Sequence, residues 1–114
     1  QVLLNLLNNA KDQFVLNKQG GCLIFINMSV KDENLHIKVK DNAGGIDNHI
    51  ISRIFEPYFT TKYRAQGTGI GLYMSEQIVT RSLKGSITAT NKKYKHNEVP
   101  YEGALITIVI PTNI

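Results

Sequence analysis

The sequence predicts an α+β fold, a two-layer sandwich in which helices pack on one face of a mixed β-sheet. Two kinds of periodicity support this prediction. Residues 2–16 and 70–83 show the 3.6-residue period of an amphipathic helix, whereas four shorter stretches show the two-residue period of strands. The four stretches are residues 22–30, 35–41, 85–91 and 103–110. A chain of 114 residues is expected to form one domain.

The predicted helix at residues 2–16 has a core face and a polar stripe beside it. Apolar residues recur on the core face at the helical period, and they are Val2, Leu3, Leu6, Leu7, Ala10 and Phe14. Asn5, Asn9 and Asp12 are spaced four and three residues apart, which places them together on the second stripe. The helix can therefore contribute both to a core and to a polar site.

The strand predicted at residues 35–41 ends in an aspartate whose carboxylate is expected to point inward. Leu35, Ile37 and Val39 alternate on the core side, and Asp41 continues that alternation. A carboxylate directed at a core is costly without a partner, so either local backbone groups or a ligand must satisfy it. The glycine pair at 44–45 favours a ligand, because glycines let a backbone approach another molecule closely.

The middle of the chain is predicted to hold a short helix and a long loop. Asp47 is expected to cap a helix that runs to about Phe55. Residues 57–69 have no regular period, and loops of this length are usually functional or disordered. Tyr58 and Phe59 are expected to anchor one end of this loop to the body of the domain.

The composition is that of a globular protein with a basic balance, at a net charge of +4. We interpret the basic cluster at residues 92–96 as a solvated hairpin loop, and we expect no nucleic-acid partner. No run approaches the roughly 18 apolar residues of a membrane span, and no signal peptide is visible. Cys22 is the only cysteine and opens an apolar run, so we expect a buried thiol in a reducing, cytoplasmic compartment. The parent protein could still be anchored in a membrane.

Four short motifs follow one another along the chain: NLLNNA at residues 5–10, DNAGGI at 41–46, FEPYFTTK at 55–62 and GTGIGL at 67–72. In this order they resemble the N, G1, F and G2 boxes of the ATP-binding catalytic domain of sensor histidine kinases. The resemblance covers nearly the whole chain and implies the Bergerat-type fold of that superfamily. It also implies a domain that binds ATP and Mg²⁺ and donates the γ-phosphoryl group to a histidine on a separate domain, as part of a two-component regulatory system.

The resemblance assigns roles to the polar residues of these motifs. It makes Asp41 the residue that recognises adenine and Asn9 the magnesium ligand, with Asn5 as a phosphate or water contact. The glycine-rich start of the second helix is expected to hold phosphate, because exposed N–H groups and the helix dipole attract anions there. The complete set of expected nucleotide-binding residues is Asn5, Asn9, Asp12, Asp41, Gly45, Ile46, Tyr58, Phe59, Thr60, Thr61, Lys62, Gly67, Thr68, Gly69, Ile70, Gly71 and Leu72.

Residues 57–68 are expected to form a mobile lid over the nucleotide. Lys62 and Arg64 could reach the terminal phosphate, although the alternative that they are ordinary exposed charges stays open. Two departures from the resemblance bear on this lid. Asp12 stands where many relatives have a lysine, and Ala65 stands where relatives with a short lid often have glycine. Phosphate neutralisation would then depend more on magnesium and on Lys62.

The same fold occurs in ATPases that hydrolyse ATP, and these carry a glutamate one helical turn before the metal-binding asparagine. That position is Asn5 in this chain, and a neutral amide cannot take a proton from water at neutral pH. The chain is therefore expected to hold ATP for transfer rather than for hydrolysis. Two alternatives stay open, a serine/threonine kinase of the anti-sigma type and a non-catalytic nucleotide-binding module.

The phosphoacceptor histidine is expected to lie outside residues 1–114. His36, His49 and His96 are placed on a strand, on the short helix and in the basic loop, and none fits a dimerising helix with an acidic neighbour. We therefore expect no catalytic residue within the chain and no autophosphorylation by the isolated chain. The expected partners besides ATP are an upstream dimerisation and phosphoacceptor domain and a response regulator. We also expect an N-terminally truncated domain, whose open flank could pair two copies.

Overall fold

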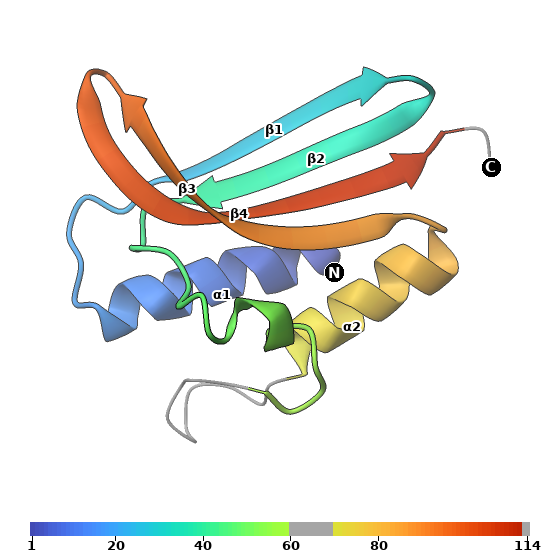
Figure 1. Cartoon of the computed structure of the whole chain (residues 1–114), viewed down its shortest axis with the longest axis horizontal. Helices are drawn as coiled ribbons and strands as arrows, with labels where there is room; N and C mark the ends of the chain where they lie inside the picture. Colours follow the sequence, from blue (N-terminus) through green and yellow to red (C-terminus); the bar gives the residue numbers. More distant parts are fainter. Residues whose placement is uncertain (60–69, 113–114) are drawn as a thin grey trace.

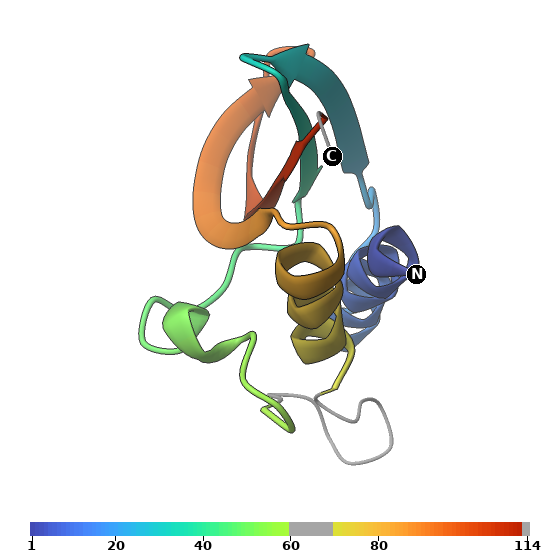
Figure 2. The ribbon, with the colours of Figure 1, turned by 90° about the vertical axis from the view of Figure 1, so that its right-hand side faces the viewer.

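The computed structural model describes residues 1–59 and 70–112, which form two layers. One layer is a four-stranded sheet, and the helices lie together against one face of it (Figure 1, Figure 2). The helical elements are α1 (Val2–Leu16), the 3-10 turn η1 (Ile51–Arg53) and α2 (Gly71–Gln77), which continues as the π-helical turn η2 (Ile78–Ser82). The strands are β1 (Ile24–Lys31), β2 (Asn34–Asp41), β3 (Ser86–His96) and β4 (Val99–Pro111). The predicted α+β class is confirmed.

The strands lie in the order β1-β2-β4-β3, and each neighbouring pair is antiparallel. A mixed sheet was predicted, but the described part of the chain contains no parallel pair. The reason is that β1–β2 and β3–β4 are hairpins and β4 runs antiparallel beside β2, from the pair Asn34↔Pro111 to the pair Lys40↔Leu105. This register sets the end of β2 beside the first half of β4, which decides the surroundings of Asp41.

The core lies between the inner face of the sheet and the helices. Its buried residues come from α1, η2, three strands and the turn after η1, and they are Leu6, Ile37, Val39, Ile54, Val79, Ile87, Ile106 and Ile108. The alternation predicted for residues 35–41 and 103–110 is thereby confirmed. A second buried cluster joins Ala10 and Phe14 of α1 to Ala43. This cluster seats the segment after Asp41 on the first helix.

The edge strand β1 differs most from the prediction. Cys22 lies in the connection from α1 and is exposed, so the predicted burial of its thiol is wrong. The thiol donates to the carbonyl oxygen of Gln19 at 3.2 Å, in a turn where Gly21 has a φ of 64°. The inward side chains of β1 are 37% to 68% exposed, and none of them joins either core cluster. They are Ile24, Ile26, Met28 and Val30.

The second hairpin is longer than predicted. The basic cluster at residues 92–96 lies on β3 and not in a loop, although its lysines are exposed as expected. The hairpin bends over the outer face of the sheet (Figure 1), where the Tyr94 and Phe25 ring centroids are 5.8 Å apart. Lys40 Nζ lies 4.0 Å from the centroid of the Tyr94 ring. These contacts between distant residues favour strand structure where the local sequence predicted a loop.

The predicted short helix is reduced to η1 and flanking turns. Asp47 begins the segment as predicted, because its Oδ1 accepts a hydrogen bond from the His49 N–H at 2.8 Å. Its carbonyl oxygen accepts from the N–H groups of Ile50 and Ile51, each at 3.0 Å. Ile54 is buried at the far end. No helix in the described ranges is long and apolar enough to cross a membrane.

Candidate functional site

A cavity of about 660 Å³ lies between α1, the segment that follows β2 and the start of α2. Its volume falls within the range of small-molecule sites in proteins, about 300–1,000 Å³. Nine of the predicted nucleotide-binding residues line it, namely Asn5, Asn9, Asp12, Asp41, Gly45, Ile46, Phe59, Gly71 and Leu72. The fold thus brings residues from all four motifs to one place.

The carboxylate of Asp41 lies in the wall of this cavity, as the strand period predicted. Its Oδ1 accepts hydrogen bonds from the backbone N–H of Ala43 at 3.0 Å and of Ala104 at 3.1 Å. These are the hydrogen bonds that the carboxylate makes within the described residues, and Oδ2 takes no part in them. Backbone groups therefore hold one oxygen in place, while the other can accept from a ligand.

Tyr94 holds the backbone of Asp41 from the outer face of the sheet. Its hydroxyl donates a hydrogen bond to the Asp41 carbonyl oxygen at 2.6 Å. Burial raises the pKa of this hydroxyl above its ordinary value of 10.0, and the charges of Asp41 and Tyr101 raise it further. The hydroxyl therefore stays protonated, and keeps donating, across the physiological pH range.

Asn5 links α1 to α2. Its Nδ2 donates to the Gly71 carbonyl oxygen at 3.2 Å and to Ser75 Oγ at 3.1 Å. Ser75 is fully buried, and its hydroxyl also donates to the Gly71 carbonyl oxygen, at 2.9 Å. The amide thus sets where α2 begins relative to α1. A phosphate or water contact at Asn5 stays a prediction.

Asn9 and Asp12 line the cavity from α1, and their side chains carry amide and carboxylate oxygens. Such hard oxygen donors suit Mg²⁺, which keeps several waters and shares phosphate oxygens when it binds with a nucleotide. Within the described residues, no group of three or more His, Cys, Asp or Glu side chains is placed to hold a metal ion. The donor types of Asn9 and Asp12 fit a magnesium ion that takes its other ligands from phosphate and water.

Some predicted residues do not reach the cavity. Tyr58 is 77% exposed and does not line it, so the prediction that Tyr58 anchors the loop is wrong. The backbone at Tyr58 is left-handed, with a φ of 65°, and the ring lies in solvent whereas Phe59 packs on the core. Ile70 is also absent from the lining. Seven residues with a predicted role fall outside the described ranges, namely Thr60, Thr61, Lys62, Arg64, Gly67, Thr68 and Gly69.

The apolar wall of the cavity and one amide behind it were not predicted from the sequence. The wall is formed by Val39, Ala43, Ile50, Ile54, Ala104 and Ile106. The amide is that of Asn91 on β3, which binds the backbone of Ile46. Asn91 continues the inward alternation of Ile87 and Ala89, so a polar residue at an inward strand position was the available signal, as it was for Asp41.

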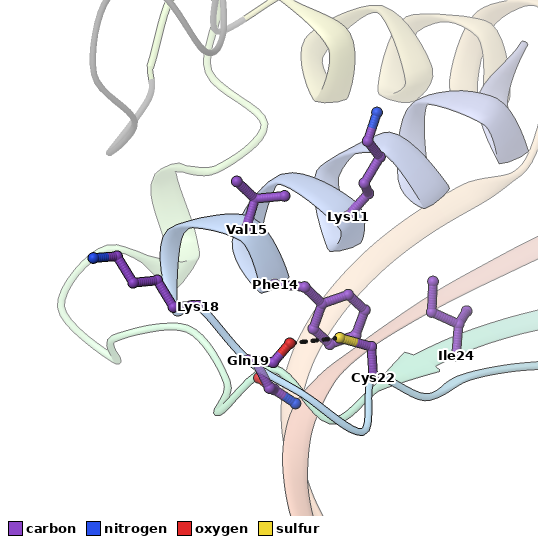
Figure 3. Close-up of a pocket in the computed structure, with 7 residues that line it drawn as sticks. All are labelled: Lys11, Phe14, Val15, Lys18, Gln19, Cys22 and Ile24. Atoms are coloured by element: carbon purple, nitrogen blue, oxygen red, sulfur yellow. Dashed lines mark hydrogen bonds between the residues drawn. The ribbon is translucent and has the colours of Figure 1, made fainter.

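A second depression, of about 610 Å³, lies between α1 and the start of β1 (Figure 3). It is lined by Lys11, Phe14, Val15, Lys18, Gln19, Cys22 and Ile24. None of the four motifs contributes to this lining, and no carboxylate comparable to that of Asp41 is part of it. The cavity that contains Asp41 is therefore the candidate functional site.

Comparison with known proteins identifies the family of the chain. All of residues 1–114 match the family described as histidine kinase-, DNA gyrase B-, and HSP90-like ATPase. The chain is 37% identical over 114 residues to the two-component sensor PprA of Pseudomonas aeruginosa. It is 34% identical over 113 residues to the signal transduction histidine-protein kinase AtoS of Escherichia coli. These two matches cover 97% and 99% of this chain, but 11% and 16% of the two sensors.

Solved structures show the same fold. The catalytic domain of histidine kinase ThkA, in a nucleotide-free form, matches with a TM-score of 0.76 at 28% identity, over 98% of this chain and 65% of that one. The mycobacterial sensor histidine kinase MprB matches with a TM-score of 0.75 at 22% identity, over 96% of this chain and 69% of that one. The second likeness concerns the fold alone.

Proposed function

Because the chain belongs to the family of histidine kinase-, DNA gyrase B- and HSP90-like ATPases, we propose that its cavity binds ATP with Asp41 as the residue that recognises adenine. The chain corresponds to the ATP-binding catalytic domain of two-component sensor histidine kinases, which are transferases. It spans less than a fifth of the length of the sensors PprA and AtoS. We therefore also propose, and do not take from these two sensors, which residue the whole parent protein phosphorylates.

The single observation that supports the role of Asp41 is that its two carboxylate oxygens differ in their hydrogen bonds. Two backbone N–H groups hold Oδ1, and Oδ2 takes no part in those bonds. The exocyclic amino group of adenine can donate a hydrogen bond to Oδ2. Guanine presents a carbonyl oxygen at the corresponding position, which would leave the carboxylate without a donor and repel it. Such a site rejects the wrong base more strongly than an apolar pocket can.

We propose Asn9 as the magnesium ligand on the phosphate side of the cavity. Its amide oxygen carries no charge that would repel the triphosphate, and Asp12 adds a carboxylate on the same wall. A bound ion would neutralise part of the phosphate charge, because the described lining contains no Lys, Arg or His side chain. Asn5 would act on this side indirectly, because it holds the carbonyl of Gly71.

We also propose that the γ-phosphoryl group passes to a histidine on a separate domain of the parent protein and from there to a response regulator in the cytoplasm. None of His36, His49 and His96 lines the cavity, which supports an acceptor elsewhere. The amide of Asn5 has no basic lone pair to activate water, and its Nδ2 is engaged with α2. These two observations support transfer over hydrolysis.

The test is the affinity of Asp41→Ala for ATP, GTP and inorganic triphosphate, measured by titration calorimetry with Mg²⁺ present. A hydrogen bond to a charged group contributes about 1.5–3 kcal/mol, so ATP affinity should fall by about tenfold or more. Triphosphate affinity should stay near that of the unmodified chain. Glu102→Ala is the matched control, because it removes an exposed carboxylate from the neighbouring strand. Equal ATP affinity in Asp41→Ala and the unmodified chain would refute the assignment.

A further inference from the structure

We propose that Asn91 is a positioning residue for adenine recognition, although it lies outside the four motifs and does not line the cavity. It holds the far end of the segment 41–46, so that the part of the cavity wall formed by Gly45 and Ile46 keeps a defined place. This inference rests on the proposed role of Asp41. Asn91 acts through the backbone of Ile46, which does line the cavity.

The side chain of Asn91 pairs with Ile46 as a neighbouring strand would. Its Oδ1 accepts from the Ile46 N–H at 2.7 Å, and its Nδ2 donates to the Ile46 carbonyl oxygen at 2.6 Å. The same Nδ2 donates to Asn48 Oδ1 at 3.1 Å. Donor and acceptor are both engaged, so the amide has one defined orientation, and the two short bonds hold Ile46 against β3.

Asn91 also packs tightly against Gly45. A Cβ at position 45 would lie 2.9 Å from Asn91 Oδ1, closer than real contacts allow. Gly45 has a φ of 85°, which residues with a side chain rarely adopt. The chain at this point therefore leaves no room for a side chain at residue 45 while Asn91 keeps its place.

One cross-strand pair holds both ends of the segment. Asn91 and Ala104 are partners in the β3–β4 register. Ala104 donates its N–H to Asp41 Oδ1 at 3.1 Å, while Asn91 binds Ile46. Between these points the Gly44 N–H donates to the carbonyl oxygen of Glu102 at 3.0 Å. The β3–β4 hairpin thus holds the segment at Asp41, Gly44 and Ile46.

Loss of the Asn91 amide would release one end of this segment and leave the hydrogen bonds of Asp41 intact. The base side of the cavity would then be less well defined, and preorganisation for adenine would be lost. The phosphate side would change little, because Asn9 and Gly71 belong to α1 and α2. A positioning role of Asn91 therefore predicts that its loss weakens binding of the adenine base and leaves binding of the triphosphate unchanged.

The experiment compares Asn91→Ala and Asn91→Asp with Asn27→Ala, which makes the same change at an exposed position on β1. Affinities for ATP, GTP and inorganic triphosphate are measured by titration calorimetry. Asn91→Ala should bind ATP about three- to tenfold more weakly, since net hydrogen bonds contribute about 0.5–1.5 kcal/mol each. The preference for ATP over GTP should narrow by a similar factor, and triphosphate affinity should stay unchanged.

The aspartate variant separates positioning from space filling. It has nearly the shape of asparagine, but it sets a carboxylate oxygen against the carbonyl of Ile46 and against Asn48 Oδ1. It should therefore lose at least as much ATP affinity as Asn91→Ala. Wild-type affinity in Asn91→Asp would overturn the inference, and so would a parallel loss of triphosphate affinity in either variant.

Two further outcomes are decisive. If Asp41→Ala weakens ATP binding and both Asn91 variants do not, Asn91 has no positioning role while the proposed function stands. If Asp41→Ala has no effect, the proposed adenine site fails, and this inference fails with it.

Should Asn91→Ala not fold, amide exchange at Ile46 in the unmodified chain decides. Protection comparable to that of the β2–β4 ladder supports the positioning role of Asn91, and rapid exchange overturns it.

Discussion

Gly103 of β4 lies so close to Asp41 of β2 that a side chain at position 103 would clash with the aspartate. A Cβ there would collide with the Asp41 carbonyl oxygen and lie 2.6 Å from Oδ1. The same carbonyl oxygen accepts from the Tyr94 hydroxyl, and the same Oδ1 accepts from the N–H of Ala104, 63 residues later in the chain. The position of the candidate adenine acceptor is thus set by the second hairpin.

Gly103→Ala is expected to destabilise the fold and to impair ATP binding. The clash is with backbone, which cannot move aside as a flexible side chain can, so we expect a cost of about 1–3 kcal/mol or more in the free energy of unfolding. Urea unfolding followed by circular dichroism measures this cost. Gly20→Ala is the control, because no atom lies within 4 Å of a Cβ there. Equal stability of the two variants would show that the β2–β4 contact is not as tight as described.

Asn9→Ala is expected to abolish most of the magnesium dependence of ATP binding. The change removes the amide oxygen that we propose as a ligand, so ATP affinity with Mg²⁺ should fall by about tenfold, equivalent to about 1.4 kcal/mol. Affinity measured with a chelator should change little. Calorimetric titrations with and without Mg²⁺ measure both quantities. Asn8→Ala tests the neighbouring amide, and an equal loss of magnesium dependence in that variant would contradict the assignment to Asn9.

Stability above pH 10 is expected to depend on Tyr94. Burial raises the pKa of its hydroxyl, so the folded chain keeps this proton at pH values where the unfolded chain loses it. The contribution is fully present below the ordinary pKa of 10.0, and it is lost as the pH rises from there through the pKa of the folded state. The free energy of unfolding should therefore fall less steeply above pH 10 in Tyr94→Phe than in the unmodified chain.

Urea titrations between pH 8 and pH 11 measure this difference. The two chains should show parallel pH dependence below about pH 9, where the tyrosine hydroxyl is protonated in both folded and unfolded states. Tyr58→Phe serves as the control, because the ring of Tyr58 is mostly exposed. Identical slopes above pH 10 in Tyr94→Phe and the unmodified chain would show that the burial of Tyr94 has no such consequence.

Features that depend on neighbouring residues could be predicted from the amino-acid sequence alone. The apolar period of α1 and the alternation along β2 and β4 specify which side of each element is buried, because helix and strand geometry repeat over a few residues. The same alternation placed Asp41 at the inner end of its strand, and the structure confirms this position. The four motifs were recognised in the same way, as short runs whose order is visible along the chain.

Features that need a partner from a distant part of the chain could not be predicted in this way, because the fold determines which residues meet. The extension of β3 depends on packing between Tyr94 and Phe25. The position of residues 41–46 depends on hydrogen bonds with Asn91 and Ala104. The amide of Asn5 is engaged with α2, which begins 66 residues later. A local pattern specifies that a side chain points inward, but the sheet register and the helix packing determine which group it meets there.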